Sequence, residues 1–406
     1  MVLLLAVACG VAVGNLYFPQ VLGPLVASGL RVPPGAAALV VTAAQFGYAV
    51  GIFLLVPLGD RFRHRPLLVT LLCLTGLGLL AASAAPVLPA LVGASALVGV
   101  TTVIAPIAGP MAAGLVSDDR RGAVTGTLLS GSIGGMLLSR TVGGAVGDWL
   151  GWRAPYLMAA ALALLLAAVL ARTLPPTTPT SRQRYPALLA EPLRLLRTEP
   201  ELRRSCFYQA TVFAAFQAVW TGVALLLTGP AYGLGASAVG ALALVNAGTM
   251  LCTPLAGRRV DRHGPDPVNL VCMLGALASA AVLAVGGLGG VPGLVALTAG
   301  TLLLDVAMQS GMVANQVRIY ALRPDARSRL NTAYMTCAFL GGGMGSWCGA
   351  RAFAHFGWPG VCALVALLAA LALARHVLRW TAARRHLPEV ALREDGGGAA
   401  LGKEPM

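Results

Sequence analysis

Charged side chains are scarce in this sequence. They make up 11% of its 406 residues, whereas 57% are hydrophobic and the mean hydropathy is +0.78. A water-soluble domain carries roughly 25% charged residues. The chain therefore cannot cover a soluble surface with charge, and we expect lipid to surround much of it.

The chain also lacks the motifs of metal, redox and phosphate chemistry. Its eight cysteines lie in or at the edges of apolar segments and form no C-x-x-C pair, so neither a disulfide framework nor a zinc site is indicated. No phosphate-binding loop or nucleophile motif is present. We therefore expect no enzymatic activity, no metal and no cofactor, and any uphill transport would use an ion gradient.

Long apolar runs take the place of charge. A helix that crosses the hydrocarbon core needs about 20 mostly apolar residues. The first run has no basic segment before it and is too long for a signal peptide, so we expect it to remain as a helix; its start at residue 2 suggests that native residues precede it. Twelve such runs lie at approximately 2–27, 35–58, 66–86, 88–115, 122–147, 153–173, 206–229, 236–256, 268–289, 292–316, 329–352 and 357–378.

The net charge of +14 is distributed unevenly along the chain. All Lys and Arg residues lie in alternate loops and the C-terminal tail, except Arg31, Arg153, Arg351 and Arg140. Such a bias is typical of cytoplasmic loops. It predicts that both termini are cytoplasmic, and it makes nucleic-acid binding an unnecessary explanation of the charge.

The longest polar segment, residues 175–204, separates six predicted spans from six. We expect an all-α membrane protein of 12 transmembrane helices in two pseudo-symmetric six-helix bundles, residues 1–174 and 205–380. The segment between them is a cytoplasmic central loop in which Ala187–Arg197 could form an amphipathic helix. Residues 381–406 are predicted to be a disordered cytoplasmic tail.

The two halves repeat one another in sequence. Asp60-Arg61 matches Asp261-Arg262 at an offset of 201 residues. A second set matches at an offset of 206 and pairs Asp119, Arg121, Gly135, Gly143 and Trp152 with Asp325, Arg327, Gly341, Gly349 and Trp358. Parallel six-helix repeats are a transporter architecture, with the substrate site between the halves.

These loops resemble the signature G-x-x-x-D-R-x-G-R-[RK] of the major facilitator superfamily. Gly257, Asp261, Arg262 and Gly264 fit it well, while the first copy keeps Asp60, Arg61 and Arg65 but has Val56 and Arg63 where the motif has glycines. Segments such as "NLYFPQ" (15–20) and "RSRLNTAYM" (327–335) resemble the bacterial drug:proton antiporter and sugar-efflux branch.

The resemblance implies a monomer in a bacterial inner membrane, with the proton gradient as energy source and a small molecule as substrate. It assigns a gating role at the cytoplasmic face to loop residues, although a solvated basic loop that only fixes topology is the alternative. The gating candidates are Asp60, Arg61, Arg65, Asp119, Arg121, Gly257, Asp261, Arg262, Gly264, Asp325 and Arg327.

Two ionisable residues lie inside the spans, Asp305 and Arg140. Charge within the bilayer is costly, so both are functional candidates. Asp305 lies 13 residues before Arg318, which places it about 20 Å from the cytoplasmic edge and near the midplane. Burial disfavours the ionised form of a carboxyl, so we predict that Asp305, in one polar stripe with Gln309 and Gln316, couples to protons or holds a substrate cation. A purely structural hydrogen bond is the alternative.

Arg140 lies about 28 Å along its helix from Arg121, nearer the outer leaflet. Antiporters of this family carry G-x-x-x-G-P-x-x-G-G here, and this chain has Arg140 in place of the proline. Its cation would pair with a carboxylate such as Asp305, a carbonyl or an anionic substrate, or would reach headgroups or water. Small residues allow the helix to pack closely, by family analogy on span 8. The predicted seam comprises Gly131, Gly135, Ser139, Gly143 and Gly144.

Further aromatic and amide residues lie inside spans and predict a cavity of mixed character, with packing between helices as the alternative for each one. They are Asn15, Tyr17, Gln45, Tyr48, Gln209, Phe213, Gln217, Trp220, Asn246 and Tyr334. Such a cavity suits a small, moderately lipophilic solute. The sequence thus predicts a secondary transporter, with proton-coupled efflux of a drug-like compound or metabolite as the first interpretation. Sugar or metabolite transport with other coupling or in the uptake direction is the second, and a non-transporting membrane receptor is the third.

Overall fold

The computed structural model describes residues 1–114, 116–117, 120–175 and 183–397. Helices account for nearly all of these residues, and no strand occurs among them. Lipid offers the backbone no hydrogen-bond partners, and a helix satisfies its amide and carbonyl groups within one segment. The apolar runs of the sequence therefore fold as helices.

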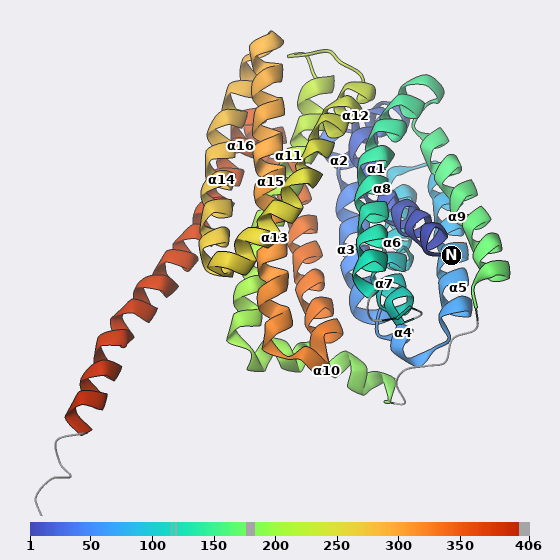
Figure 1. Ribbon diagram of the computed structural model, residues 1–406. Coiled ribbons are helices and arrows are strands. Elements are labelled where there is room, and N and C mark those ends of the chain that lie inside the picture. The colour runs from blue at the N-terminus through green and yellow to red at the C-terminus, as the bar shows by residue number, and fades with distance from the viewer. Residues whose placement is uncertain (115, 118–119, 176–182, 398–406) are drawn as a thin grey trace, which may run out of the picture.

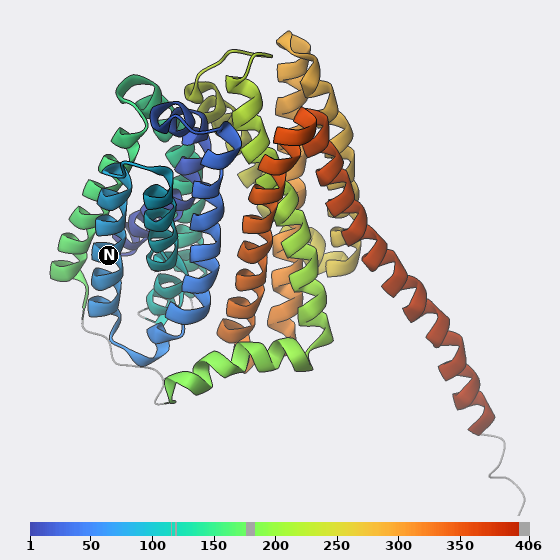
Figure 2. The ribbon, with the colours of Figure 1, turned by 180° about the vertical axis from the view of Figure 1, so that it is seen from behind.

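Helices from the first part of the chain form one group and those from the second part form another (Figure 1; Figure 2). The first group comprises α1 (Val2–Leu30), α2 (Pro34–Ala37), α3 (Leu39–Leu55), α4 (Leu58–Arg61), α5 (His64–Ser83), α6 (Leu88–Thr101), α7 (Ile104–Gly114), α8 (Arg121–Leu150) and α9 (Arg153–Thr173). After α10 (Tyr185–Thr198), the second group comprises α11 (Pro200–Thr228), α12 (Ala236–Val245), η2 (Asn246–Leu251), α13 (Cys252–His263), α14 (Pro265–Val285), η3 (Gly286–Leu288), α15 (Gly290–Leu322), η4 (Pro324–Ala326) and α16 (Arg327–Gly397).

Among the described residues, ten helices are long and apolar enough to cross a membrane, or eleven if the bent pair Ala236–Thr249 and Pro254–His263 counts as one span. The sequence predicts twelve. Part of the difference arises at Gly357, where a non-helical backbone (φ 63°, ψ −157°) forms a kink between two helical segments that together make up α16. One assigned helix thus covers the two predicted spans 329–352 and 357–378. The same helix continues into the predicted tail as far as Gly397, and residues 398–406 of that tail lie outside the described residues.

Close contacts between small residues hold helices together inside each group. A Cβ at Gly135 of α8 would lie 2.0 Å from the carbonyl oxygen of Gly10 in α1. A Cβ at Gly341 of α16 would lie 2.3 Å from the carbonyl oxygen of Ala210 in α11. Since Gly135 and Gly341 are matched by the sequence repeat, the repeat corresponds to equivalent packing in the two halves.

α10 lies across one end of the molecule and contacts both groups (Figure 1). The hydroxyl of Tyr185 donates to the carbonyl of Leu54 in α3 over 2.7 Å. Further along α10, Glu191 forms an ion pair with Arg329 of α16 at 2.6 Å. The predicted amphipathic segment Ala187–Arg197 is therefore helical, and its helix bridges the two groups.

Candidate functional site

A cavity of about 620 Å³ lies between the two groups of helices. Its wall is mainly apolar and aromatic, and it includes four of the predicted cavity residues, Tyr17, Tyr48, Gln209 and Phe213. Gln309, predicted to lie in the polar stripe of Asp305, also lines it. The cavity extends to Tyr320 and Arg327 beside η4, at the end of the molecule where α10 lies. Such a space suits a small solute with a large apolar surface.

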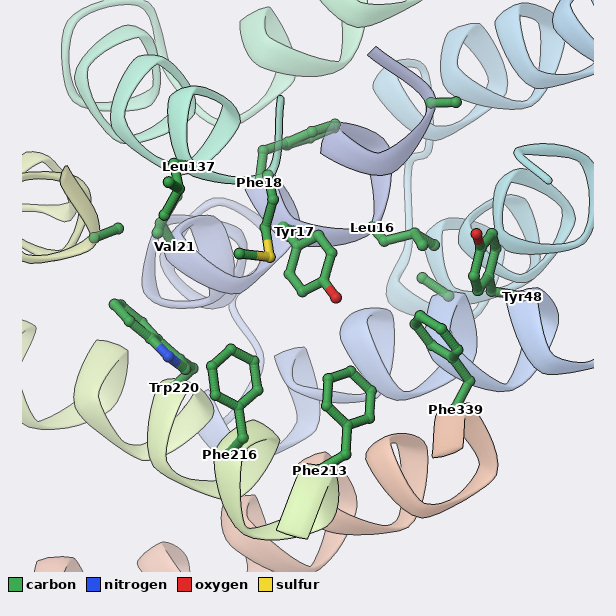
Figure 3. Packing of buried hydrophobic residues seen from close by; sticks show 14 of the residues in the cluster. Leu16, Tyr17, Phe18, Val21, Tyr48, Leu137, Phe213, Phe216, Trp220 and Phe339 are labelled. Carbon is green, nitrogen blue, oxygen red and sulfur yellow. The ribbon is translucent and has the colours of Figure 1, made fainter. Parts of the chain in front are cut away.

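Aromatic rings form the wall where the groups meet. Figure 3 shows Phe213 and Phe216 of α11 facing Tyr17 of α1, with Trp220 further along α11 on the side of Val21. Tyr48 of α3 meets Phe339 of α16 edge-to-face, with ring centres 4.4 Å apart. Both of these pairings join the first group to the second.

A layer of buried polar side chains lies one helical turn beyond the cavity, on the side away from η4. Gln20, Arg140 and Gln217 follow the lining residues Tyr17, Met136 and Phe213 by three or four positions, and on α15, which runs toward η4, Asp305 precedes Met308 and Gln309 by three and four. We call Gln20, Arg140, Gln217, Trp220 and Asp305 the polar layer; all five are buried.

Arg140 is the centre of this layer and is fully buried, so it does not reach headgroups or water in this conformation. Its Nε and Nη2 donate to Oε1 of Gln20 at 3.1 and 2.6 Å. Its guanidinium lies over three aromatic rings, those of Trp220, Tyr17 and Phe216, at 4.1, 5.0 and 5.6 Å from their centres. Cation–π contacts of this kind stabilise a desolvated cation.

Asp305 joins the layer through Trp220, whose Nε1 donates to Oδ1 of Asp305 over 3.3 Å. The ion pairs found among the described residues do not include Arg140 and Asp305, so the direct pairing considered from sequence is not formed here. The two groups still act on one another electrostatically. The indole of Trp220 contacts both and connects the cation to the carboxylate.

Two side chains of the layer have an unused hydrogen-bond donor. Gln20 donates from Nε2 to Oε1 of Gln217 at 2.9 Å, which extends the layer from α8 through α1 to α11. Nη1 of Arg140 and Nε2 of Gln217 are buried and have no hydrogen-bond partner within the described part of the chain. The layer therefore has capacity for an additional acceptor, such as water or a polar group of a solute.

The other predicted amides and hydroxyls divide into partnered and unpartnered groups. Asn15 donates to Thr102 at 3.4 Å, and Tyr334 donates to Gln209 at 3.0 Å, so these contacts join helices within one group. Gln316 is half-buried on α15 and is not part of the cavity wall described above. The side chains of Gln45 and Asn246 are fully buried with neither amide atom partnered by protein.

The gating candidates of the first half contact segments on the α10 side. Arg61 donates to the carbonyl of Gln183 at 3.3 Å, and Arg65 donates to the carbonyl of Ala171 at the end of α9. Asp60 interacts electrostatically with Arg329 in the first turn of α16. Arg121 begins α8, and Asp119 lies outside the described residues.

The second copy of the signature is arranged differently. Asp261 and Arg262 are exposed on α13 after Gly257, and Gly264 has a left-handed φ of 79° where the chain turns into α14. Asp325 is exposed in η4, and Arg327 donates to the carbonyl of Tyr320 at 3.3 Å. Two residues after Gly264, in the first turn of α14, the carboxylate of Asp266 forms ion pairs with Arg204 of α11 and Arg318 of α15. The sequence analysis did not predict this ion-pair network.

The predicted seam of small residues packs mainly on α1, not on span 8 as expected. Gly131 lies against Ala6, Gly135 against Gly10, and Ser139 against Gly14. Gly143 lies against Phe18. Only Gly144, on the adjacent face of α8, meets α12, where its Cβ would lie 2.6 Å from the carbonyl oxygen of Ala236. A repeat of four residues identifies one face of a helix and cannot identify the neighbour of that face.

Asp148 is a further contact between the groups that was not predicted. Its carboxylate accepts hydrogen bonds from the backbone amides of Ala236 and Ser237, at 3.0 and 2.7 Å, in the first turn of α12. Nearby, the hydroxyl of Thr141 donates to the carbonyl of Gly240 over 3.0 Å. These bonds hold α8 to α12 at the end of the molecule opposite α10. The only sequence signal was an aspartate at the far end of a span, because its partners are backbone amides.

Comparison with known proteins agrees with this architecture. The family model described as "Major Facilitator Superfamily" matches residues 3–284. The uncharacterized transporter YgaY of Escherichia coli O157:H7 is 35% identical over 369 residues, which cover 91% of this chain and 93% of YgaY. A probable transporter of Streptomyces coelicolor is 34% identical over 384 residues, covering 93% and 86% of the two chains.

More distant similarities are also present. A chloramphenicol resistance protein of Streptomyces lividans is 28% identical over 256 residues, covering 63% of this chain and 64% of that protein. The crystal structure of the nucleoside transporter NupG superposes with a TM-score of 0.72 at 14% identity, over 94% of this chain and 99% of NupG. The D-xylose-proton symporter gives 0.66 at 19% identity, over 91% and 96%.

Proposed function

This chain belongs to the major facilitator superfamily, a family of secondary transporters rather than enzymes, and from that premise we propose that it exports a small organic molecule in exchange for protons. The observation that carries the proposal is the position of Asp305. Asp305 is a buried carboxyl in the polar layer between the two groups of helices, one helical turn from a solute-sized cavity. Trp220 links it to the cation of Arg140.

Alternating access is supported by the asymmetry of the two ends. The cavity reaches η4 and the α10 end, whereas Asp148 and Thr141 hold α8 to α12 at the opposite end. With the basic loops and both termini in the cytoplasm, this conformation is inward-facing. We further propose that the chain crosses the membrane twelve times, in two bundles of six helices. In this count α16 contributes two crossings, one before and one after Gly357, and the bent α12–α13 pair contributes one.

Export of a drug-like solute is favoured by the apolar, aromatic cavity and by the similarity to a chloramphenicol resistance protein. Transport of a nucleoside or sugar, in either direction, is the second candidate, because the structural neighbours include transporters named for those solutes. A non-transporting receptor has no such support. The protein is proposed to act as a monomer in a bacterial inner membrane, with the proton gradient as its energy source.

The test is flux through purified protein in proteoliposomes under an imposed pH gradient. Radiolabelled chloramphenicol, a nucleoside and D-xylose serve as the three probes, with protein-free liposomes as the blank. Accumulation of chloramphenicol against its gradient, driven by protons moving the other way, would support the proposal. Proton-driven movement of the nucleoside or the sugar alone would favour the second candidate, and no movement of any probe would count against transport of these classes.

A further inference from the structure

The break in the eighth predicted span has features that the proposed function does not yet use. The chain tightens to a 3-10 helix over Asn246–Leu251, which is η2. The two arms of the span, Ala236–Thr249 and Pro254–His263, are bent by 40° relative to one another. In transporters, interrupted helices near the midplane often form ion sites, because the break leaves polar groups without helical partners. The question is therefore what binds the polar groups at this break.

Asn246, the first residue of η2, is fully buried, and neither its Oδ1 nor its Nδ2 has a hydrogen-bond partner among the residues that the structure describes. A buried amide without partners is costly, so a molecule that completes its hydrogen bonds is favoured at this position. The side-chain amide of Asn246 has an acceptor, Oδ1, and a donor, Nδ2. Water satisfies both, whereas a sodium ion would bind Oδ1 and leave Nδ2 unpaired.

The helix register places Asn246 on a level with Asp305. Nε2 of Gln309 in α15 donates to Oγ1 of Thr249 over 2.8 Å, which fixes the two segments at that height. α12 and α15 run in the same direction (Figure 1). Three residues of 3-10 helix from Thr249 to Asn246 rise about 6 Å, and four residues of α-helix from Gln309 to Asp305 also rise about 6 Å.

The same residues connect Asp305 to the cavity. Gln309 is part of the cavity wall, and its partner Thr249 donates in turn to the backbone carbonyl of Asn246 at 2.8 Å. Asp305 itself is not in that wall, so a proton needs a relay to reach it. The charged or titratable groups that act on Asp305 are Arg140 of α8 and Tyr17 of α1.

We propose that the break holds ordered water against Asn246, and that this water carries the proton between the cavity and Asp305 along the line of Gln309 and Thr249. The inference rests on the proposed function, because it takes Asp305 as the proton site. In it Asn246 is a positioning residue, since it holds the water and does not itself gain or lose the proton.

The test measures how fast Asp305 changes protonation in the purified full-length protein. Trp220 donates a hydrogen bond to Asp305, so Trp220 fluorescence after a stopped-flow pH jump reports the change in protonation of Asp305. The part of the signal that is lost in both Trp220→Phe and Asp305→Asn is assigned to this change. We expect Asn246→Leu to slow this relaxation at least tenfold with the same final amplitude. Asn246→Ser, whose hydroxyl can hold the water, should keep at least a third of the rate.

Asn269→Leu is the matched control. Asn269 is also a buried asparagine of the second half, but its Nδ2 already bonds the carbonyl of Pro265 within α14. Slowing by Asn246→Leu and not by Asn269→Leu supports the relay. If Asn246→Leu does not fold, Gln309→Leu tests the cavity end of the same line, with the same slowing expected.

Other results would overturn the relay. An unchanged rate in Asn246→Leu, or equal slowing by both asparagine variants, excludes it while leaving Asp305 as a proton site. A shift of the pH midpoint when sodium chloride replaces choline chloride would assign the break to a sodium ion instead of water. No Asp305-dependent signal in the unmodified protein would remove both the relay and the proton site on which the proposed function depends.

Discussion

The guanidinium of Arg140 lies over the ring of Trp220, 4.1 Å from its centre. The contact joins α8 of the first group of helices to α11 of the second. Trp220 also donates to Asp305, and Arg140 acts electrostatically on that carboxyl, so removal of the cation takes a compensating charge away from it. Arg140 therefore contributes both to the packing of the polar layer and to the balance of charge within it.

We predict that Arg140→Met inserts and folds but loses at least tenfold in proton-driven transport. Methionine restores apolar volume between the rings, whereas the charge and both bonds to Gln20 are lost. Arg140→Lys should be intermediate, because lysine keeps the charge without the planar stacking surface. Flux under a pH gradient and the yield of folded protein are the two measurements. Arg153→Met is the control, since Arg153 makes a similar contact of 4.2 Å with Trp152 away from the polar layer.

Asp305→Asn should abolish proton-driven accumulation and leave solute exchange at equal pH within about twofold of the unmodified rate. An asparagine can still accept the bond from Trp220 and has the same volume, so the fold is retained, but it cannot bind and release a proton. Glu199→Gln is the control and should change neither activity, because Glu199 lies at the start of α11, away from the polar layer, and pairs with the exposed Arg323. Uphill transport by Asp305→Asn at the normal rate would remove Asp305 from the proton path.

Asp148→Asn should loosen the end of the molecule opposite α10. A carboxylate at a helix N-terminus is worth typically 0.3–1 kcal/mol, and up to about 2 kcal/mol when partly buried. Loss of the charge should therefore raise the population of the form open at that end by roughly 2–30-fold. Hydrogen exchange of the peptide containing Ala236 and Ser237 measures it, because those amides bond Asp148 in the closed form. Unchanged exchange there would mean that the carboxylate contributes nothing to closure.

Gly135→Val should prevent close packing of α8 on α1. The added Cβ would overlap the carbonyl oxygen of Gly10 at 2.0 Å, and backbone cannot move aside as a flexible side chain can. Overpacking of this severity costs about 3 kcal/mol or more. The thermal midpoint and the yield of folded protein should both fall. Gly134→Val is the matched control, because a Cβ on the neighbouring residue meets nothing within 4 Å.

Much of the fold follows from the sequence because lipid leaves the backbone few choices. Apolar runs of sufficient length become helices, and the matched glycines Gly135 and Gly341 correctly indicate equivalent packing in two halves. The identity of the neighbouring helix does not follow in the same way. The seam of α8 was assigned to span 8 by analogy, whereas its four-residue repeat meets α1, since periodicity defines a face but not what lies against it.

Four members of the polar layer, Arg140, Asp305, Trp220 and Gln217, stand out in the sequence because polar groups are rare in apolar spans. The fifth, Gln20, was not among the candidates, and the arrangement of the five was not predictable. That an indole would connect the cation to the carboxylate depends on helix rotation and height, which no residue count provides. Asp148 was missed for another reason: its partners are main-chain amides, which leave no mark on the composition of α12.

The permanence of the charge on Arg140 has a consequence for the response to membrane voltage. With Asp305 ionised, the polar layer is electrically neutral overall, and with Asp305 protonated it carries one positive charge. A membrane potential of 100 mV acts on one elementary charge moved across the whole bilayer with about 2.3 kcal/mol. Under the proposed function, voltage would therefore accelerate or oppose the proton-loaded conformational step and would hardly affect the unloaded step.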